Sequence, residues 1–120
     1  MILVTTKEVV MKKLYTMREI DKVFGCKHAA YSMSKVESYL PEGGYTLMVD
    51  IDDVPIKGTF KLCHEGWDNE RFEEEVTDPT VNQIMQVFDR AIEATGDFHH
   101  VFLEGLNNKG DGRVYFQTGS

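Results

Sequence analysis

The segment from residue 79 to residue 95 limits most strongly what this chain can fold into. Its apolar side chains recur at intervals of three and four residues, which is the period of an α-helix with one buried face. Asp78 is a candidate N-cap, Pro79 suits the first helical position, and Gly96 suits a left-handed C-cap. A helix of this kind must cover another apolar surface, so the rest of the chain is expected to supply one. The apolar positions are Val81, Ile84, Met85, Phe88, Ala91 and Ile92.

Two pairs of β-prone runs are candidates for that surface. Residues 45–52 and 56–63 alternate between apolar and polar side chains on either side of a short turn, which predicts a first β-hairpin. Residues 98–106 and 113–117 flank a turn-rich segment, which predicts a second. The expected fold is therefore α+β, with an antiparallel sheet of two β-hairpins covered by the single amphipathic helix at 79–95.

The first 40 residues are predicted to be mainly helical. The sequence from Thr16 to Glu19 matches a capping box, which indicates a helix that ends at Gly25. Residues 29–40 show a second, weaker helical spacing. At 120 residues the chain is expected to form a single domain, in which these helical segments pack beside the hairpin–helix–hairpin of residues 41–120.

The net charge of −7 is unevenly distributed along the chain. Residues 1–40 hold seven Lys/Arg and four Asp/Glu, whereas residues 41–120 hold six and sixteen. No apolar run approaches the roughly 20 residues that a membrane span needs, so no membrane partner is expected. Two cysteines without a secretory signal favour a reducing compartment, which predicts a cytoplasmic protein.

The acidic charge is concentrated in residues 64–78, which hold seven acids and one arginine. The segment is expected to be a solvated connection that carries two aromatic anchors. The function we expect is that of a non-enzymatic binding or inhibitory accessory protein, in which this acidic surface contacts a macromolecular, preferably protein, partner. Small acidic inhibitors and accessory proteins of phage or bacterial type have this size and charge. The expected contact residues are Trp67, Asp68, Glu70, Phe72, Glu73, Glu74 and Glu75.

A small anionic ligand, such as a nucleotide, is an alternative partner. It would occupy a pocket between the helix and the sheet, and the interface of a homodimer is one place for such a pocket. Arginine and lysine would neutralise the ligand's charge there. The residues expected to line this site are His100, Lys109, Arg113 and Tyr115.

A third alternative is a small DNA-binding regulator. The run from Tyr15 to Ile20, followed by Phe24-Gly25-Cys26, resembles the first helix and turn of a helix-turn-helix, with a recognition helix then expected before residue 40. The resemblance implies phosphate contacts by the basic residues of the segment. The acidic balance of the rest of the chain makes nucleic acid the less favoured partner. These basic residues are Lys12, Lys13, Arg18, Lys27 and Lys35.

The acidic run from Asp50 to Asp53 raises the question of catalysis. After an apolar run it resembles the nucleophile motif of haloacid-dehalogenase-type phosphatases, and with Gly43-Gly44 before it, the paired aspartates of nucleotidyltransferases. These resemblances imply phosphoryl or nucleotidyl transfer with a bound metal. Cross-strand pairing with Lys57 and Lys61 explains the aspartates more simply, so an enzyme is not the preferred interpretation.

Four cysteines and histidines could in principle form a zinc site, but their spacing does not favour it. Cys63 and His64 are adjacent, and adjacent residues in a strand point to opposite faces. Cysteine ligands of zinc are usually separated by two to four residues, and the two cysteines of this chain are not. We therefore expect no metal and no cofactor. The four residues are Cys26, His28, Cys63 and His64. The pair His99-His100 is predicted to lie in a strand, with one imidazole facing the helix.

Overall fold

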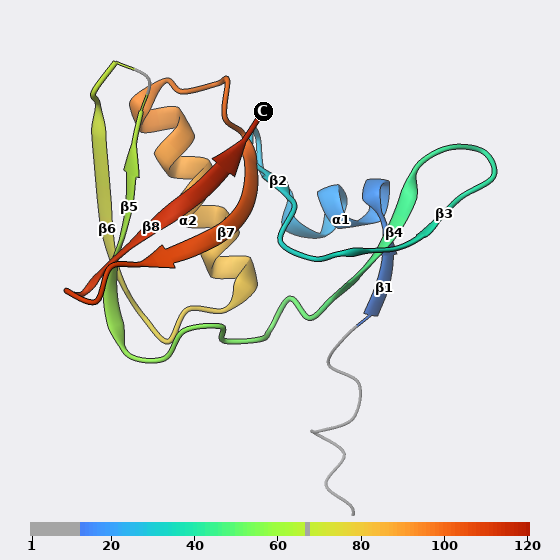
Figure 1. Ribbon diagram of the computed structural model, residues 1–120, viewed down its shortest axis with the longest axis horizontal. Coiled ribbons are helices and arrows are strands. Elements are labelled where there is room, and N and C mark those ends of the chain that lie inside the picture. The colour runs from blue at the N-terminus through green and yellow to red at the C-terminus, as the bar shows by residue number, and fades with distance from the viewer. Residues whose placement is uncertain (1–12, 67) are drawn as a thin grey trace, which may run out of the picture.

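The computed structural model describes residues 13–66 and 68–120, and these residues form two helices and eight strands (Figure 1). In chain order the elements are β1 (Lys13–Thr16), α1 (Met17–Phe24), β2 (Ala30–Tyr31), β3 (Val36–Tyr39), β4 (Tyr45–Val49), β5 (Thr59–Glu65), β6 (Arg71–Thr77), α2 (Val81–Thr95), β7 (Phe102–Asn108) and β8 (Arg113–Gly119).

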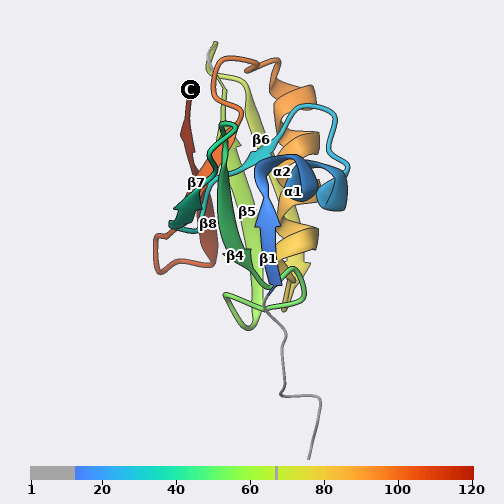
Figure 2. The same ribbon diagram turned by 90° about the vertical axis from the view of Figure 1, so that its right-hand side faces the viewer.

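Five of the strands form one sheet in the order β2-β7-β8-β5-β6. β5 pairs with β6 and β7 pairs with β8 in antiparallel hairpins, and the hairpins join through parallel pairing of β5 with β8. α2 connects the two hairpins and lies on one side of the sheet, whereas no helix of the described chain lies on the other side (Figures 1 and 2). The prediction of an α+β protein is thus confirmed, and so is the second hairpin.

The stripe on α2 is buried as predicted, because all six of its apolar positions are 6 % exposed or less. The helix begins two residues later than expected, at Val81 and not at Pro79. Thr80, not Asp78, is its N-cap: the Thr80 hydroxyl accepts a hydrogen bond from the Gln83 N–H, and the Gln83 side chain accepts one from the Thr80 N–H. Asp78 instead accepts a hydrogen bond from the Gly58 N–H at 2.6 Å. Gly96 ends the helix in the left-handed conformation, as predicted.

The first predicted hairpin is wrong. β4 pairs with β1 and β3 in a separate three-stranded sheet, and β5 pairs with β6 and β8. Residues 50–58 cross between the sheets, so the aspartates do not face Lys57 and Lys61 across a pair of strands. The crossing segment has another role, since the carbonyls of Ile51 and Asp53 accept hydrogen bonds from the first N–H groups of α2.

For the described residues 13–40, the prediction of a mainly helical N-terminal part is also wrong. α1 begins after the capping box of Thr16 and Glu19 and ends at Gly25, but it is only eight residues long. Residues 29–40 hold β2 and β3 and no helix, so the recognition helix implied by the helix-turn-helix resemblance is absent. The acidic segment 64–78 was expected to be a connection, yet it holds the end of β5 and the whole of strand β6. The β-prone residues 98–101 precede β7 as a turn, so His99 and His100 lie outside the strand.

The buried apolar side chains of both sheets belong to one cluster, which includes Ile20 and Phe24 of α1 and Leu47 of β4. Polar contacts reinforce the junction between the helices: the side-chain amide of Gln86 on α2 donates to the Phe24 carbonyl at 2.5 Å. No helix of the described residues is long and apolar enough to cross a membrane.

Candidate functional site

β6 is an edge strand of the five-stranded sheet. In the described chain it pairs only with β5, so the backbone N–H and C=O groups along its outer edge have no strand partner there. Arg71, Glu73 and Glu75 are exposed, whereas Phe72 and Glu74 are half-buried, as the alternation of a strand requires. The edge is seven residues long, which is enough to pair with an added strand.

Each glutamate of β6 has a basic residue beside it that comes from another element. The Arg113 Nε of β8 donates to Glu73 at 3.0 Å, and Arg90 of α2 donates to both carboxylate oxygens of Glu74 at 3.0 and 2.6 Å. Lys61 of β5 lies opposite Glu75 in the strand register. The hydrogen bond from Arg113 holds the pKa of Glu73 below its ordinary value. These contacts explain why three adjacent glutamates are compatible with a strand.

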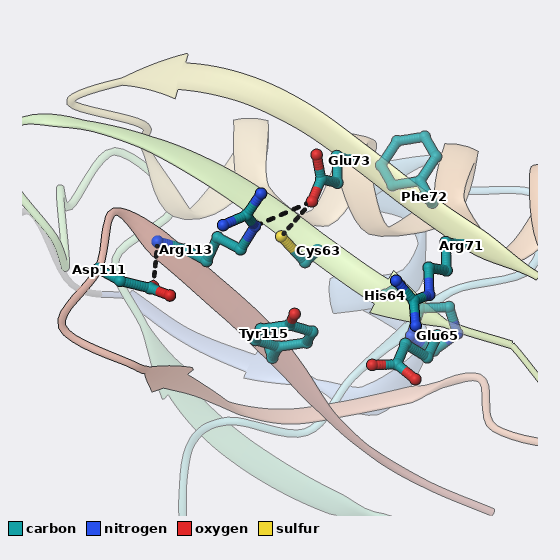
Figure 3. A pocket seen from close by; sticks show the side chains of 9 residues that line it. All are labelled: Cys63, His64, Glu65, Arg71, Phe72, Glu73, Asp111, Arg113 and Tyr115. Carbon is teal, nitrogen blue, oxygen red and sulfur yellow. Dashed lines mark hydrogen bonds and ion pairs between the residues drawn. The ribbon is translucent and has the colours of Figure 1, made fainter.

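The open face of the sheet has a shallow depression of about 220 Å³ beside β6. Figure 3 shows Arg113, Glu73 and Cys63 joined across it, with the ribbon of α2 behind the strands. Two arginines and three carboxylates line the depression, so its charge is mixed. The lining residues are Cys63, His64, Glu65, Arg71, Phe72, Glu73, Asp111, Arg113 and Tyr115.

Cys63 lies beneath this depression and is 2 % exposed. Burial raises the pKa of its thiol, and the neighbouring Glu73 raises it further. A thiol nucleophile must be deprotonated, so this environment disfavours covalent catalysis by Cys63.

The structure brings together three of the four residues expected to bind an anion. Arg113 and Tyr115 lie on the open face, and the Lys109 ammonium lies 5.6 Å from the centre of the Tyr115 ring. This face is opposite to α2, so the three do not line a pocket between helix and sheet as predicted. His100 lies apart from them and contacts Asp97.

The acidic residues predicted to contact a partner do not form one flat surface. Glu73 and Glu75 share the open face, but Glu74 and Phe72 lie on the side of α2. Asp68 and Glu70 are exposed in the turn that joins β5 to β6. Trp67 lies outside the described residues. The acidic edge therefore consists of the turn and both sides of β6.

Asp50 and Cys26, two further candidate site residues, make hydrogen bonds to the backbone. The Asp50 carboxylate accepts a hydrogen bond from the Asp52 N–H at 3.0 Å within a turn. Cys26 donates to the Met85 carbonyl, and burial raises the pKa of its thiol to about 12. Cys63 and His64 point to opposite faces of β5. Among the described residues no group of three or more His, Cys, Asp or Glu side chains is arranged to hold a metal ion.

Sequence reasoning missed a cluster around Asp97, which is 2 % exposed. His100 Nδ1 lies 3.0 and 3.1 Å from the two carboxylate oxygens, and His64 Nε2 lies 3.4 Å from Oδ2. The only signal in the sequence is an acid placed directly after the C-cap glycine of a helix, where the helix dipole disfavours negative charge.

Comparison of the chain with family models, curated proteins and solved structures finds no match in any of the three. The geometry of β6 and its surroundings is therefore the basis on which a function is proposed.

Proposed function

We propose that this protein is a binding protein, of inhibitory or accessory type, that docks onto an extended basic segment of a macromolecular partner along β6. The observation that carries the proposal is the position of β6 at the sheet edge, with one strand neighbour among the described residues and a run of three glutamates. An extended peptide that adds to such an edge gains main-chain hydrogen bonds, and side chains on alternate positions give specificity.

The charge near β6 supports a basic occupant. Residues 65–78 hold seven acids, and the basic residues that the described chain places in β6 or beside it are Arg71, Arg90, Arg113 and Lys61. The acids therefore remain in excess. Exposed ion pairs contribute about 0–1 kcal/mol each, so a partner's lysines and arginines can exchange with the internal ones at low cost.

The same charges disfavour pairing of β6 with a second copy of the chain. In a twofold antiparallel arrangement centred on Glu74, the two Glu74 side chains would face each other, and Glu73 would face Glu75. Like charges directly opposite each other destabilise a strand pair. A homodimer through this edge is thus a poorer proposal than a basic partner.

The test uses a synthetic peptide of alternating lysine and threonine as the probe, and the matching glutamate–threonine peptide as its control. Titration of the ¹⁵N-labelled protein, followed by NMR, should give saturable amide shifts concentrated in β6 and β5 with the lysine peptide alone. Saturable binding of both peptides, or shifts that lie away from β6, would refute the proposal.

A double variant, Glu73→Gln with Glu75→Gln, should weaken binding of the lysine peptide by about twofold to thirtyfold, because each exposed charge pair is worth roughly 0.2–1 kcal/mol. Glutamine keeps the side-chain length, so the strand is retained. Glu37→Gln is the matched control, since Glu37 is an exposed acid in β3, at an edge of the other sheet. Equal affinity of the double variant and the control would count against the acidic edge.

A small anionic ligand on the open face is the second candidate, supported by the proximity of Arg113, Lys109 and Tyr115. The three carboxylates around the depression oppose it. Titration with adenosine triphosphate separates the two proposals: shifts at the amides of residues 109–115, with none along β6, would favour the ligand over the basic segment.

A further inference from the structure

The carboxylate of Asp97 is buried at the corner of the fold where β5 ends and the connection from α2 to β7 begins. Its contacts with other charged or titratable groups of the described chain come from two imidazoles, those of His64 and His100. His64 belongs to β5, so the contact ties the end of one strand to the end of α2. His100 closes the same connection three residues further on.

His64 is 4 % exposed and lies among aromatic rings. Its ring is edge-on to Phe88 of α2 at 5.8 Å and to Phe116 of β8 at 6.3 Å, and Phe72 is its partner in β6. The titratable groups that act on it are Asp97 and His100 from the α2–β7 connection and Glu65 from its own strand. The buried carboxylate of Asp97 is thus in contact with the imidazoles of both His64 and His100.

The Nε2 atom of His64 has no hydrogen bond of standard geometry in the described chain. It lies 3.4 Å from Asp97 Oδ2, close enough for electrostatic attraction but long for a good hydrogen bond. Burial lowers the pKa of His64, although Asp97 opposes this effect. The closed corner therefore holds His64 in its neutral form more firmly than an open, solvated corner would.

We propose that His64, Asp97 and His100 form an acid-sensitive latch, which opens this corner when the buried imidazole of His64 takes up a proton. The added positive charge is then buried against the rings of Phe88 and Phe116. Opening hydrates His64 and removes this cost. The latch is a property of the fold and does not depend on the partner proposed for β6.

The sign of the pH effect follows from proton linkage. Because His64 binds a proton more weakly in the closed corner, the open corner takes up the extra proton once the pH falls below about 6.5, the ordinary pKa of histidine. The equilibrium constant for opening then increases by up to about tenfold per pH unit. The increase ends when the pH falls below the pKa of His64 in the closed corner.

Amide hydrogen exchange of the whole chain between pH 7.5 and 5, corrected for intrinsic rates, tests the latch. Three reporter amides lie in the corner: Gly66 N–H donates to the Glu70 carbonyl, Gly96 N–H to the Ile92 carbonyl, and Phe98 N–H to the Gly96 carbonyl. Their protection should fall as the pH decreases, while that of Ile84, at the other end of α2, should change much less. Constant protection in the corner would overturn the proposal.

The variant His64→Gln keeps a polar side chain of similar size that does not titrate, and it should abolish the loss of protection. His28→Gln is the matched control, because His28 contacts Glu93 away from the latch, and it should behave as the wild type. If His64→Gln folds poorly, the pH titration of His64 in the wild-type protein tests the latch instead. The NMR resonance of His64 must titrate below about pH 6.5, over the range in which corner protection falls. The same loss of protection in the variant, or a titration outside that range, would refute the latch.

Discussion

Asp89 holds the segment after α1 against α2 through a single carboxylate. Oδ1 accepts hydrogen bonds from the N–H groups of His28 and Ala29 at 2.7 and 2.9 Å, and Oδ2 accepts one from Lys27 at 2.9 Å. Burial raises the pKa of Asp89, but the three N–H groups together outweigh this effect and leave the pKa below its ordinary value. One side chain thus fixes the path of the chain between α1 and β2.

We expect Asp89→Asn to lower the free energy of unfolding by about 2 kcal/mol, since it removes hydrogen bonds to a charged group and leaves backbone donors unpaired. The wild-type contribution should be complete above the unfolded pKa of about 3.9 and be lost as the pH falls towards the lower folded value. Urea denaturation at pH 7 and at pH 3 measures both effects. Glu93→Gln, which alters an exposed contact of His28, should change stability by less than about 0.5 kcal/mol. Equal effects of the two variants would contradict this role for Asp89.

Residue-scale roles of this kind could not be predicted from the sequence. Asp89 lies on the polar side of an amphipathic pattern, where a solvated acid is the ordinary interpretation, and its partners are about 60 residues away. Asp97 and His64 are likewise distant in sequence and meet only after α2 is placed on the sheet. By contrast, the left-handed conformations of Gly25 and Gly96 were predictable, because each follows a helical pattern directly.

Helix α2 is the element on which sequence and structure agree best, apart from its first residue. Thr80→Ala should lower the free energy of unfolding by about 1 kcal/mol, because the Gln83 N–H loses its acceptor. Thr80→Ser retains the hydroxyl and should keep most of the stability. Thermal denaturation of both variants at neutral pH makes the comparison. A loss as large in the serine variant as in the alanine variant would show that the methyl group, not the cap, is what matters.

The strands were harder to predict than the helices because alternation identifies a strand without identifying its neighbours. Residues 45–49 and 59–63 both form strands, but their local pattern does not indicate which strands they pair with. Residues 45–49 pair with β1 and β3, and residues 59–63 pair with β6 and β8. β6 was missed because adjacent glutamates have low β-propensity. Arg90 and Arg113, from α2 and β8, compensate that charge in the folded chain.

The described residues of the molecule form two sheets, yet their buried apolar side chains form one cluster, in which the ring centres of Phe24 of α1 and Tyr31 lie 5.4 Å apart. The Phe24 carbonyl also accepts the hydrogen bond from Gln86 of α2. The Phe24 side chain therefore packs in a core that is shared by both sheets. The sequence-based expectation of a single domain therefore becomes a prediction about cooperativity.

Phe24→Ala should lower the free energy of unfolding by about 3–5 kcal/mol, the usual cost of removing a buried phenylalanine. If the two sheets unfold together, amides of β4 and of β5 should lose the same amount of protection in native-state hydrogen exchange. Val23→Ala is the matched control, because Val23 is the neighbouring residue on α1 and is 37 % exposed. Its effect should be below about 1 kcal/mol, as for most surface substitutions. Loss of protection in β4 alone, with β5 as in the wild type, would show two independently stable units. In that case the acidic edge of β6 and the latch at His64 would belong to the α2 unit by itself.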